Sequence, residues 1–92
     1  MGGGTNFTSY EYKPLSLINS FSNLTVGDLI IFIATAVGVS HTLTVVNGAE
    51  FVTGDNPFTE GQCAVFRATD TSCRIDNSYD YSAYRCVIIL KQ

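Results

Sequence analysis

The sequence predicts a single small all-β domain, either a β-sandwich of jelly-roll type or a barrel, with roughly seven or eight mostly antiparallel strands. β-branched and aromatic residues recur along the whole chain, and no stretch of a dozen residues repeats apolar positions at helical spacing. Turn signals recur about every 8 to 12 residues, a spacing typical of sandwiches and barrels. The 92 residues suffice for one hydrophobic core. We therefore expect a flexible arm over residues 1–7 and one β domain over residues 8–92.

The first half of the domain is expected to begin with an edge strand at residues 8–12. Lys13-Pro14 should end that strand, because proline cannot donate to a strand ladder and is confined to edges and strand starts. A short strand at 15–18 and a polar loop at 19–23 follow. Residues 29–36 are apolar at neighbouring positions, which predicts a central strand covered on both faces.

Asn47-Gly48 is the clearest turn signal in the chain. It separates strand-like residues 42–46 from residues 49–53, and both of its residues tolerate the positive φ of a type I′ turn. The sequence therefore predicts a two-residue hairpin here. Residues 54–61 are dense in turn formers and predict a surface loop that exposes Phe58.

Three further strands are predicted in the last third of the chain, at residues 62–69, 72–75 and 84–90. The first of them alternates so that one face carries Ala64, Phe66 and Ala68. In the last, the pattern places Arg85 and Lys91 toward water and the following residues together on the other face: Tyr84, Cys86, Ile88 and Leu90.

Charge and hydropathy exclude two classes of partner. The five basic residues are scattered through a chain of net charge -3, so no stripe exists that could track phosphates, and we expect no nucleic acid. The longest apolar run, residues 29–39, is about half the ~20 residues of a membrane helix, and we expect no membrane. Residues 1–4 lack the start of a secretory signal, which favours synthesis in a cytoplasm. A mature form whose signal has been removed stays open.

Enzyme and metal motifs fail their structural tests. Ser40 and His41 are adjacent, so on a strand they point to opposite faces, and we expect a partly exposed structural histidine. Residues 76–80 begin like a calcium loop, but Tyr81 stands where that loop needs glycine. The three cysteines have no metal spacing; free thiols are favoured over one disulfide with a spare thiol. We expect no catalytic residues, no cofactor and no metal.

An interaction role fits the composition better. Only 14% of the residues are charged, against about 25% in an average domain, which favours burial of surface against copies or partners. Aromatic residues of the arm, the first strand and the loops are the candidate contacts: Phe7, Tyr10, Tyr12, Phe58, Tyr79 and Tyr81.

Four segments carry a family resemblance: Val-Gly-Asp-Leu-Ile-Ile at 26–31, His-Thr-Leu-Thr-Val at 41–45, Asn-Gly-Ala-Glu-Phe-Val at 47–52 and Ala-Val-Phe-Arg-Ala-Thr at 64–69. Over residues 25–90 the chain resembles small β-sandwich domains of bacteriophage virion proteins. The resemblance implies a non-enzymatic capsid decoration, head fibre or tail accessory subunit in the virion, made in the host cytoplasm.

On this interpretation, the N-terminal arm and the edge strand at 8–12 attach the protein by strand addition. Its partners would be itself, for example as a homotrimer, and a capsid or tail protein. The alternative is a carbohydrate or host-receptor binding module whose partner is a surface glycan.

Overall fold

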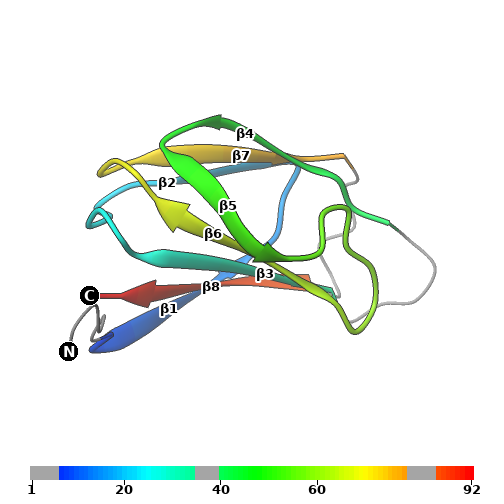
Figure 1. Cartoon of the computed structure of the whole chain (residues 1–92), viewed down its shortest axis with the longest axis horizontal. Helices are drawn as coiled ribbons and strands as arrows, with labels where there is room; N and C mark the ends of the chain where they lie inside the picture. Colours follow the sequence, from blue (N-terminus) through cyan, green and yellow to red (C-terminus); the bar gives the residue numbers. More distant parts are fainter. Residues whose placement is uncertain (1–6, 35–39, 79–84) are drawn as a thin grey trace.

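The computed structural model describes residues 7–34, 40–78 and 85–92, with the backbone alone at 85–86. Within those residues there is no helix of the length and apolarity that crossing a membrane requires. The predicted all-β class is confirmed, because the described residues form eight antiparallel strands (Figure 1): β1 (Ser9–Pro14), β2 (Ile18–Phe21), β3 (Leu29–Ala34), β4 (Leu43–Asn47), β5 (Ala49–Gly54), β6 (Cys63–Ala68), β7 (Cys73–Asn77) and β8 (Arg85–Lys91).

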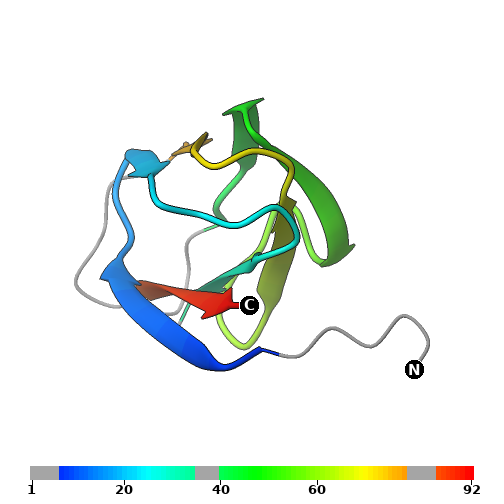
Figure 2. The same cartoon turned by 90° about the vertical axis from the view of Figure 1, so that its left-hand side faces the viewer.

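The strands form two sheets packed face to face. One sheet has five strands in the order β1-β8-β3-β6-β5, and the other has three in the order β2-β7-β4. Figure 2 shows β2, β7 and β4 on one side of the core and β1, β8 and β3 on the other. The pairs β1 with β8, β2 with β7 and β3 with β6 are nested, which is the connectivity of a jelly roll. Most consecutive strands therefore lie in opposite sheets.

The core fills the space between the inward faces of the two sheets. The three residues of β6 that alternation placed on one face, Ala64, Phe66 and Ala68, are all buried, so this face is the inward one. The rings of Phe32 and Phe66 meet edge to face at 5.6 Å, a favoured aromatic geometry. The other strands contribute further buried side chains: Phe21, Ile30, Ala34, Leu43, Cys73, Ile75, Val87 and Ile89.

The hairpin predicted at Asn47-Gly48 is wrong. β4 pairs with β7 and β5 pairs with β6, so the two strands beside this turn lie in different sheets. A type I′ turn needs positive φ at both residues, whereas here Gly48 has φ +74° and Asn47 is not in that region. Gly48 is instead a corner where the chain passes between sheets, close to the backbone of Ser72 and Cys73.

The second strand lies three residues later than predicted, at Ile18–Phe21 in place of 15–18. Asn19 explains the shift. Its side chain donates to the carbonyl oxygens of Ser16 and Ile75, both at 2.9 Å, and accepts from the Ser16 N–H at 2.9 Å. The amide therefore closes the turn after β1 and also holds β2 against β7, so the polar residues expected in a loop belong to a strand.

The faces of β8 are the reverse of those predicted. Val87 and Ile89 are buried in the core, and Ile88 and Leu90 lie half-buried on the opposite face. β3 likewise was expected to be covered on both sides, but its residues Leu29, Ile31 and Ile33 are half-buried on the side away from the second sheet. Both strands are apolar on both faces, so alternation alone could not decide which face turns inward.

A buried carboxylate fixes the C-terminal end of β8. Asp28 is fully buried and accepts hydrogen bonds from the backbone N–H of Thr25 at 2.9 Å and of Gln92 at 3.0 Å. The Lys91 ammonium lies 3.1 Å from the same carboxylate, so the expectation that Lys91 faces water is wrong. Burial alone would raise the pKa of Asp28, but these three partners together lower it below its ordinary value.

We expect Asp28→Asn to lower the free energy of unfolding at pH 7 by about 2 kcal/mol, because it leaves the half-buried Lys91 ammonium without its counter-charge and removes an acceptor from two backbone N–H groups. Since the folded-state pKa is lowered, this contribution is present above about pH 4 and is lost as the pH falls through the folded pKa, below 3.8. Urea unfolding of both proteins at pH 7 and pH 3 measures it. Asp76→Asn, which removes an exposed ion pair with Arg74, is the control and should change stability far less.

We expect Gly48→Ala to destabilise the fold by about 3 kcal/mol, since a Cβ there would strain the backbone and collide with the Ser72 carbonyl and the Cys73 Cα. Gly61→Ala is a matched control, because Gly61 has a similar φ of +78° and a Cβ added there would meet no atom within 4 Å. It should cost only the backbone strain, about 1 kcal/mol. Equal losses in thermal unfolding would mean that the close approach at the corner is unimportant.

Candidate interaction surface

His41 is a structural residue in this fold. It is 1% exposed and not partly exposed as the sequence suggested. Its backbone forms two hydrogen bonds with that of Phe58, at 2.8 and 2.9 Å, and its ring lies 5.2 Å from the Phe58 ring. Its Nδ1 lies 3.2 Å from Oδ1 of Asn77, while the neighbouring Ser40 is exposed. The imidazole is thus packed inside the protein against Phe58 and Asn77.

The acidic residues of the described segments form no metal site. Among residues 7–34, 40–78 and 85–92, no group of three or more His, Cys, Asp or Glu side chains could hold a metal ion. Asp76, from the calcium-like segment, instead accepts two hydrogen bonds from the Arg74 guanidinium, at 2.8 and 2.9 Å. Those bonds lower the pKa of the Asp76 carboxyl, which serves as an ion-pair partner within β7.

The five-stranded sheet presents an apolar surface on the side that faces away from the three-stranded sheet. We call this surface the outer face. Strand register arranges its residues in rows across the sheet. Each row is given from β1 to β5. Row one is Tyr10, Leu90, Leu29, Arg67 and Glu50. Row two is Tyr12, Ile88, Ile31, Val65 and Thr53, and row three includes Ile33 and Cys63.

Nothing in the described part of the chain covers this surface. Tyr10 and Tyr12 are 69% and 66% exposed, and the aliphatic residues between β1 and β5 are half-buried. No described strand lies beyond the five-stranded sheet (Figures 1 and 2). Its outward positions are therefore apolar where an antiparallel sheet that faces water normally carries polar residues.

The three-stranded sheet follows the normal pattern and gives an internal comparison. Its outward positions include Ser20, Arg74, Asp76 and Thr44, beside the exposed Ile18. The two sheets share one core, so burial in that core does not explain why only the five-stranded sheet is apolar outside. The difference marks the outer face as a contact surface.

The outer face is also electrically neutral. The charged side chains in its rows are Arg67 and Glu50, which form an ion pair at 3.0 Å while each remains about half exposed. The pair lies at the β5 edge of the sheet, and the tyrosines lie at the β1 edge. A partner for this surface must therefore be apolar at its centre and able to meet an ion pair and phenol groups at its margins.

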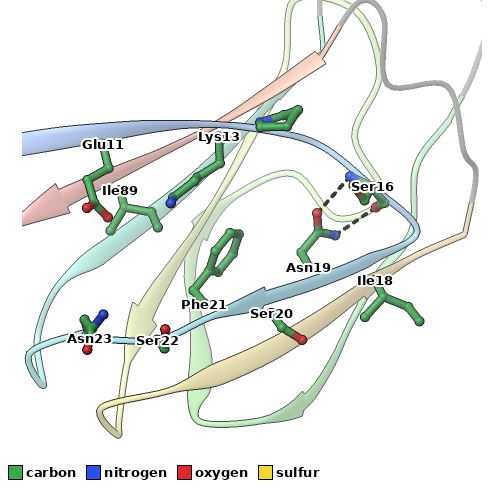
Figure 3. A pocket seen from close by; sticks show the side chains of 11 residues that line it. Glu11, Lys13, Ser16, Ile18, Asn19, Ser20, Phe21, Ser22, Asn23 and Ile89 are labelled. Atoms are coloured by element: carbon green, nitrogen blue, oxygen red, sulfur yellow. Dashed lines mark hydrogen bonds between the residues drawn. The ribbon is translucent and has the colours of Figure 1, made fainter.

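A polar groove opens between the edge strands β1 and β2. Its volume is about 280 Å³, and Figure 3 shows Glu11 and Lys13 on one wall, opposite Phe21. Glu11 and Lys13 pair with the buried Ile89 and Val87, so they point to the inner side of the sheet. They remain exposed because the second sheet has only three strands and does not extend over β1.

The aromatic residues predicted from sequence as contacts lie in different parts of the structure. Tyr10 and Tyr12 lie on the outer face, and Phe7 is half-buried just before β1. Phe58 is fully buried against His41, so the prediction that it faces outward is wrong. Tyr79 and Tyr81 lie outside the described residues.

The aliphatic centre of the outer face, Ile31, Ile88 and Leu90, was not predicted from sequence as a contact surface. Its signal in the sequence was that the strands at 29–34 and 85–91 are apolar on both faces.

Comparison with protein-family models, with curated proteins and with solved structures found no match to this chain.

The thiols of Cys63 and Cys73 are free and differ in accessibility. Cys63 is half-buried on the outer face, whereas Cys73 is buried, and burial raises its pKa to about 11. The thiolate is the form that reacts with maleimides. At pH 8 we expect a maleimide to modify Cys63 in the folded protein and to leave Cys73 unmodified, as followed by peptide mass spectrometry. When concentrated urea unfolds the protein, both thiols should react. Equal rates in the folded protein would contradict the burial of Cys73.

Proposed function

We propose that this protein is a non-enzymatic structural subunit that functions by binding other protein surfaces, including copies of itself. The observation that carries the proposal is the outer face of the five-stranded sheet, a neutral surface with an aliphatic centre that no described residue covers. A site of this kind supplies contact area and no chemistry. The only histidine, the best catalytic candidate in the sequence, is buried in the core.

The size of the outer face supports this role. Five strands spaced at ~4.8 Å and about six residues long give a footprint of roughly 480 Å². Its part that is apolar throughout rows one and two, on β1, β8 and β3, covers roughly 290 Å², close to the ~300–600 Å² of the largest apolar patch on a typical monomer, which is often functional. In a chain with only 14% charged residues, this surface has few polar groups nearby to keep isolated copies apart.

The edge strand β1 offers a second mode of attachment. It lies at the end of the five-stranded sheet, all six of its residues are exposed, and among the described strands it pairs only with β8. An exposed edge of this kind can accept a strand from another chain. Attachment through this strand and the preceding arm, residues 1–7, belongs to the proposal.

The narrower form of the proposal is a subunit of a bacteriophage virion: a capsid decoration, a head fibre or a tail accessory protein. The resemblance of residues 25–90 to β-sandwich domains of such proteins supports it, as does the jelly-roll connectivity. In a symmetric shell or tail, many copies multiply a weak contact, so a surface of modest area can hold a subunit in place. The partner would then be a capsid or tail protein.

A carbohydrate or host-receptor binding module is the second candidate, and the groove between β1 and β2 is the observation that favours it. Hydroxyl, amide and charged side chains line the groove around Phe21, a mixture that suits a ligand with many hydroxyl groups. A glycan array discriminates, since a purely structural subunit should bind no glycan and a binding module should select one class.

The first test is the mass of the purified wild-type chain, measured by light scattering between about 1 and 500 µM. We expect a defined oligomer whose population rises with concentration, because association buries the outer face. A protein that stays monomeric over this whole range would contradict self-assembly. Binding to a glycan by such a monomer would favour the second candidate.

A further inference from the structure

We infer that the outer face binds the outer face of a second copy of this chain, across a two-fold axis that runs along β3 between the two five-stranded sheets. The inference rests on the proposed function and names the partner and its orientation. It predicts a dimer in place of the trimer that the sequence suggested. The inference is based on the order of residues in the rows. This rotation places each row opposite the same row of the second copy, with chemically complementary side chains facing one another.

Row one shows the complementarity. It begins at the β1 edge with Tyr10, continues through Leu90 and Leu29, and ends at the β5 edge with Arg67 and Glu50. A two-fold axis along the central strand keeps each residue at its own level and exchanges the two edges. Tyr10 of each copy then faces the Arg67–Glu50 pair of the other. A phenol ring and hydroxyl suit that pair, because the ring can stack on the guanidinium and the hydroxyl can donate to the carboxylate.

The centre of the interface is aliphatic under the same rotation. In row two, Ile31 lies at the axis and meets its own copy, while Ile88 faces Val65 and Tyr12 faces Thr53. Each of the two contacts away from the axis occurs twice, as an isologous dimer requires. Sheets packed in this way lie about 10 Å apart with strands inclined by roughly 30°, so half-buried aliphatic side chains from both faces can interdigitate.

The area and the charges are consistent with a specific but modest dimer. Two flat footprints of roughly 480 Å² together approach the ~1,000 Å² lower limit for a biological interface. The projecting side chains add further accessible surface to this flat area. Arg67 and Glu50 already neutralise each other at 3.0 Å, so closing the dimer buries no unpaired charge. A rotation axis across the strands would instead place Tyr10 against Tyr10 and ion pair against ion pair, and this complementarity would be lost.

Cross-linking tests the orientation. The variant combines Tyr10→Cys with Glu50→Cys in a background of Cys63→Ser and Cys86→Ser, and is treated with a short bis-maleimide. The two engineered positions are on strands at opposite edges of the sheet, four strand spacings or roughly 19 Å apart, so a link within one chain is excluded. We expect a covalent dimer from the double variant and none from either single variant. A dimer from Tyr10→Cys alone, or no dimer at all, would overturn the proposed axis.

A matched pair of substitutions tests the surface itself. Ile31→Lys places two ammonium groups at the axis and should weaken dimerisation at least about a hundredfold, measured by sedimentation equilibrium. Ile18→Lys makes the same change at the 55% exposed Ile18 of the other sheet and should leave dimerisation unchanged. Circular dichroism and thermal unfolding of each variant establish that it is folded.

Failure of this inference and failure of the proposed function give different results. An oligomer that survives Ile31→Lys, or that contains three chains, overturns this inference and leaves the proposed structural role in place. A wild-type chain that is monomeric at every concentration overturns this inference together with the self-assembly in the proposed function, and leaves attachment to a different protein as the remaining form of that function.

Discussion

The antiparallel pairing of β3 with both β6 and β8 is the contact on which the rest of this structure depends. It joins residues 29–34 to residues 63–68 and 85–91, segments that are far apart in the sequence, and it forms the centre of the larger sheet. Because successive side chains of a strand alternate between faces, the three strands that supply this sheet's share of the core also supply the centre of the outer face. Ile30 and Phe32 cannot enter the core unless Ile31 and Ile33 point the other way. The apolar contact surface is therefore a direct consequence of how this core is built, once both sets of positions are apolar.

The unequal width of the two sheets explains the remaining surface features. Three strands suffice to cover the inward apolar residues described on β8, β3 and β6, which are buried. β1 lies beyond that cover, so its inward residues Glu11 and Lys13 are polar and line the groove beside β2. On the opposite edge, the corner at Gly48 carries the chain directly from β4 into β5, which adds β5 to the larger sheet and leaves the smaller one at three strands. The turn at Gly48 thus places β5, which carries Glu50, in the larger sheet as its fifth strand.

Alternation of apolar and polar residues predicted the fold class and most strands. It could not decide which face enters the core where both faces of a strand are apolar. In β6, alternation grouped Ala64, Phe66 and Ala68 on one face, and the structure buries all three. β3 and β8 are apolar at most positions on both faces, and only the pairing partners decide which face enters the core. Asn47-Gly48 satisfied the local rule for a hairpin, but the long-range pairings with β7 and β6 override it. Phe58 was assigned to solvent because its neighbours form turns, yet its backbone pairs with His41 and draws the ring into the core. Such contacts have no local sequence signature.

The contacts of Asp28 with Lys91 and Gln92, which we call the C-terminal latch, link complete folding to the formation of the contact surface. β8 is the last strand in sequence but lies between β1 and β3, so the outer face is continuous only when residues 85–91 are in place. A shift of β8 by one residue would exchange Val87 and Ile89 for Ile88 and Leu90 in the core, at little cost in hydrophobicity, because both sets are aliphatic. Hydrophobic burial therefore specifies this register weakly.

The buried Asp28 specifies the register strongly, since its carboxylate accepts from Lys91 and Gln92 together. The latch adjoins row one, where Leu90 lies between Tyr10 and Leu29. A one-residue shift of β8 would break both contacts of the latch and would also remove Leu90 from this row. The charge pair at one end of the core thus sets the alignment of tyrosine, leucine and ion pair on the opposite side of the sheet.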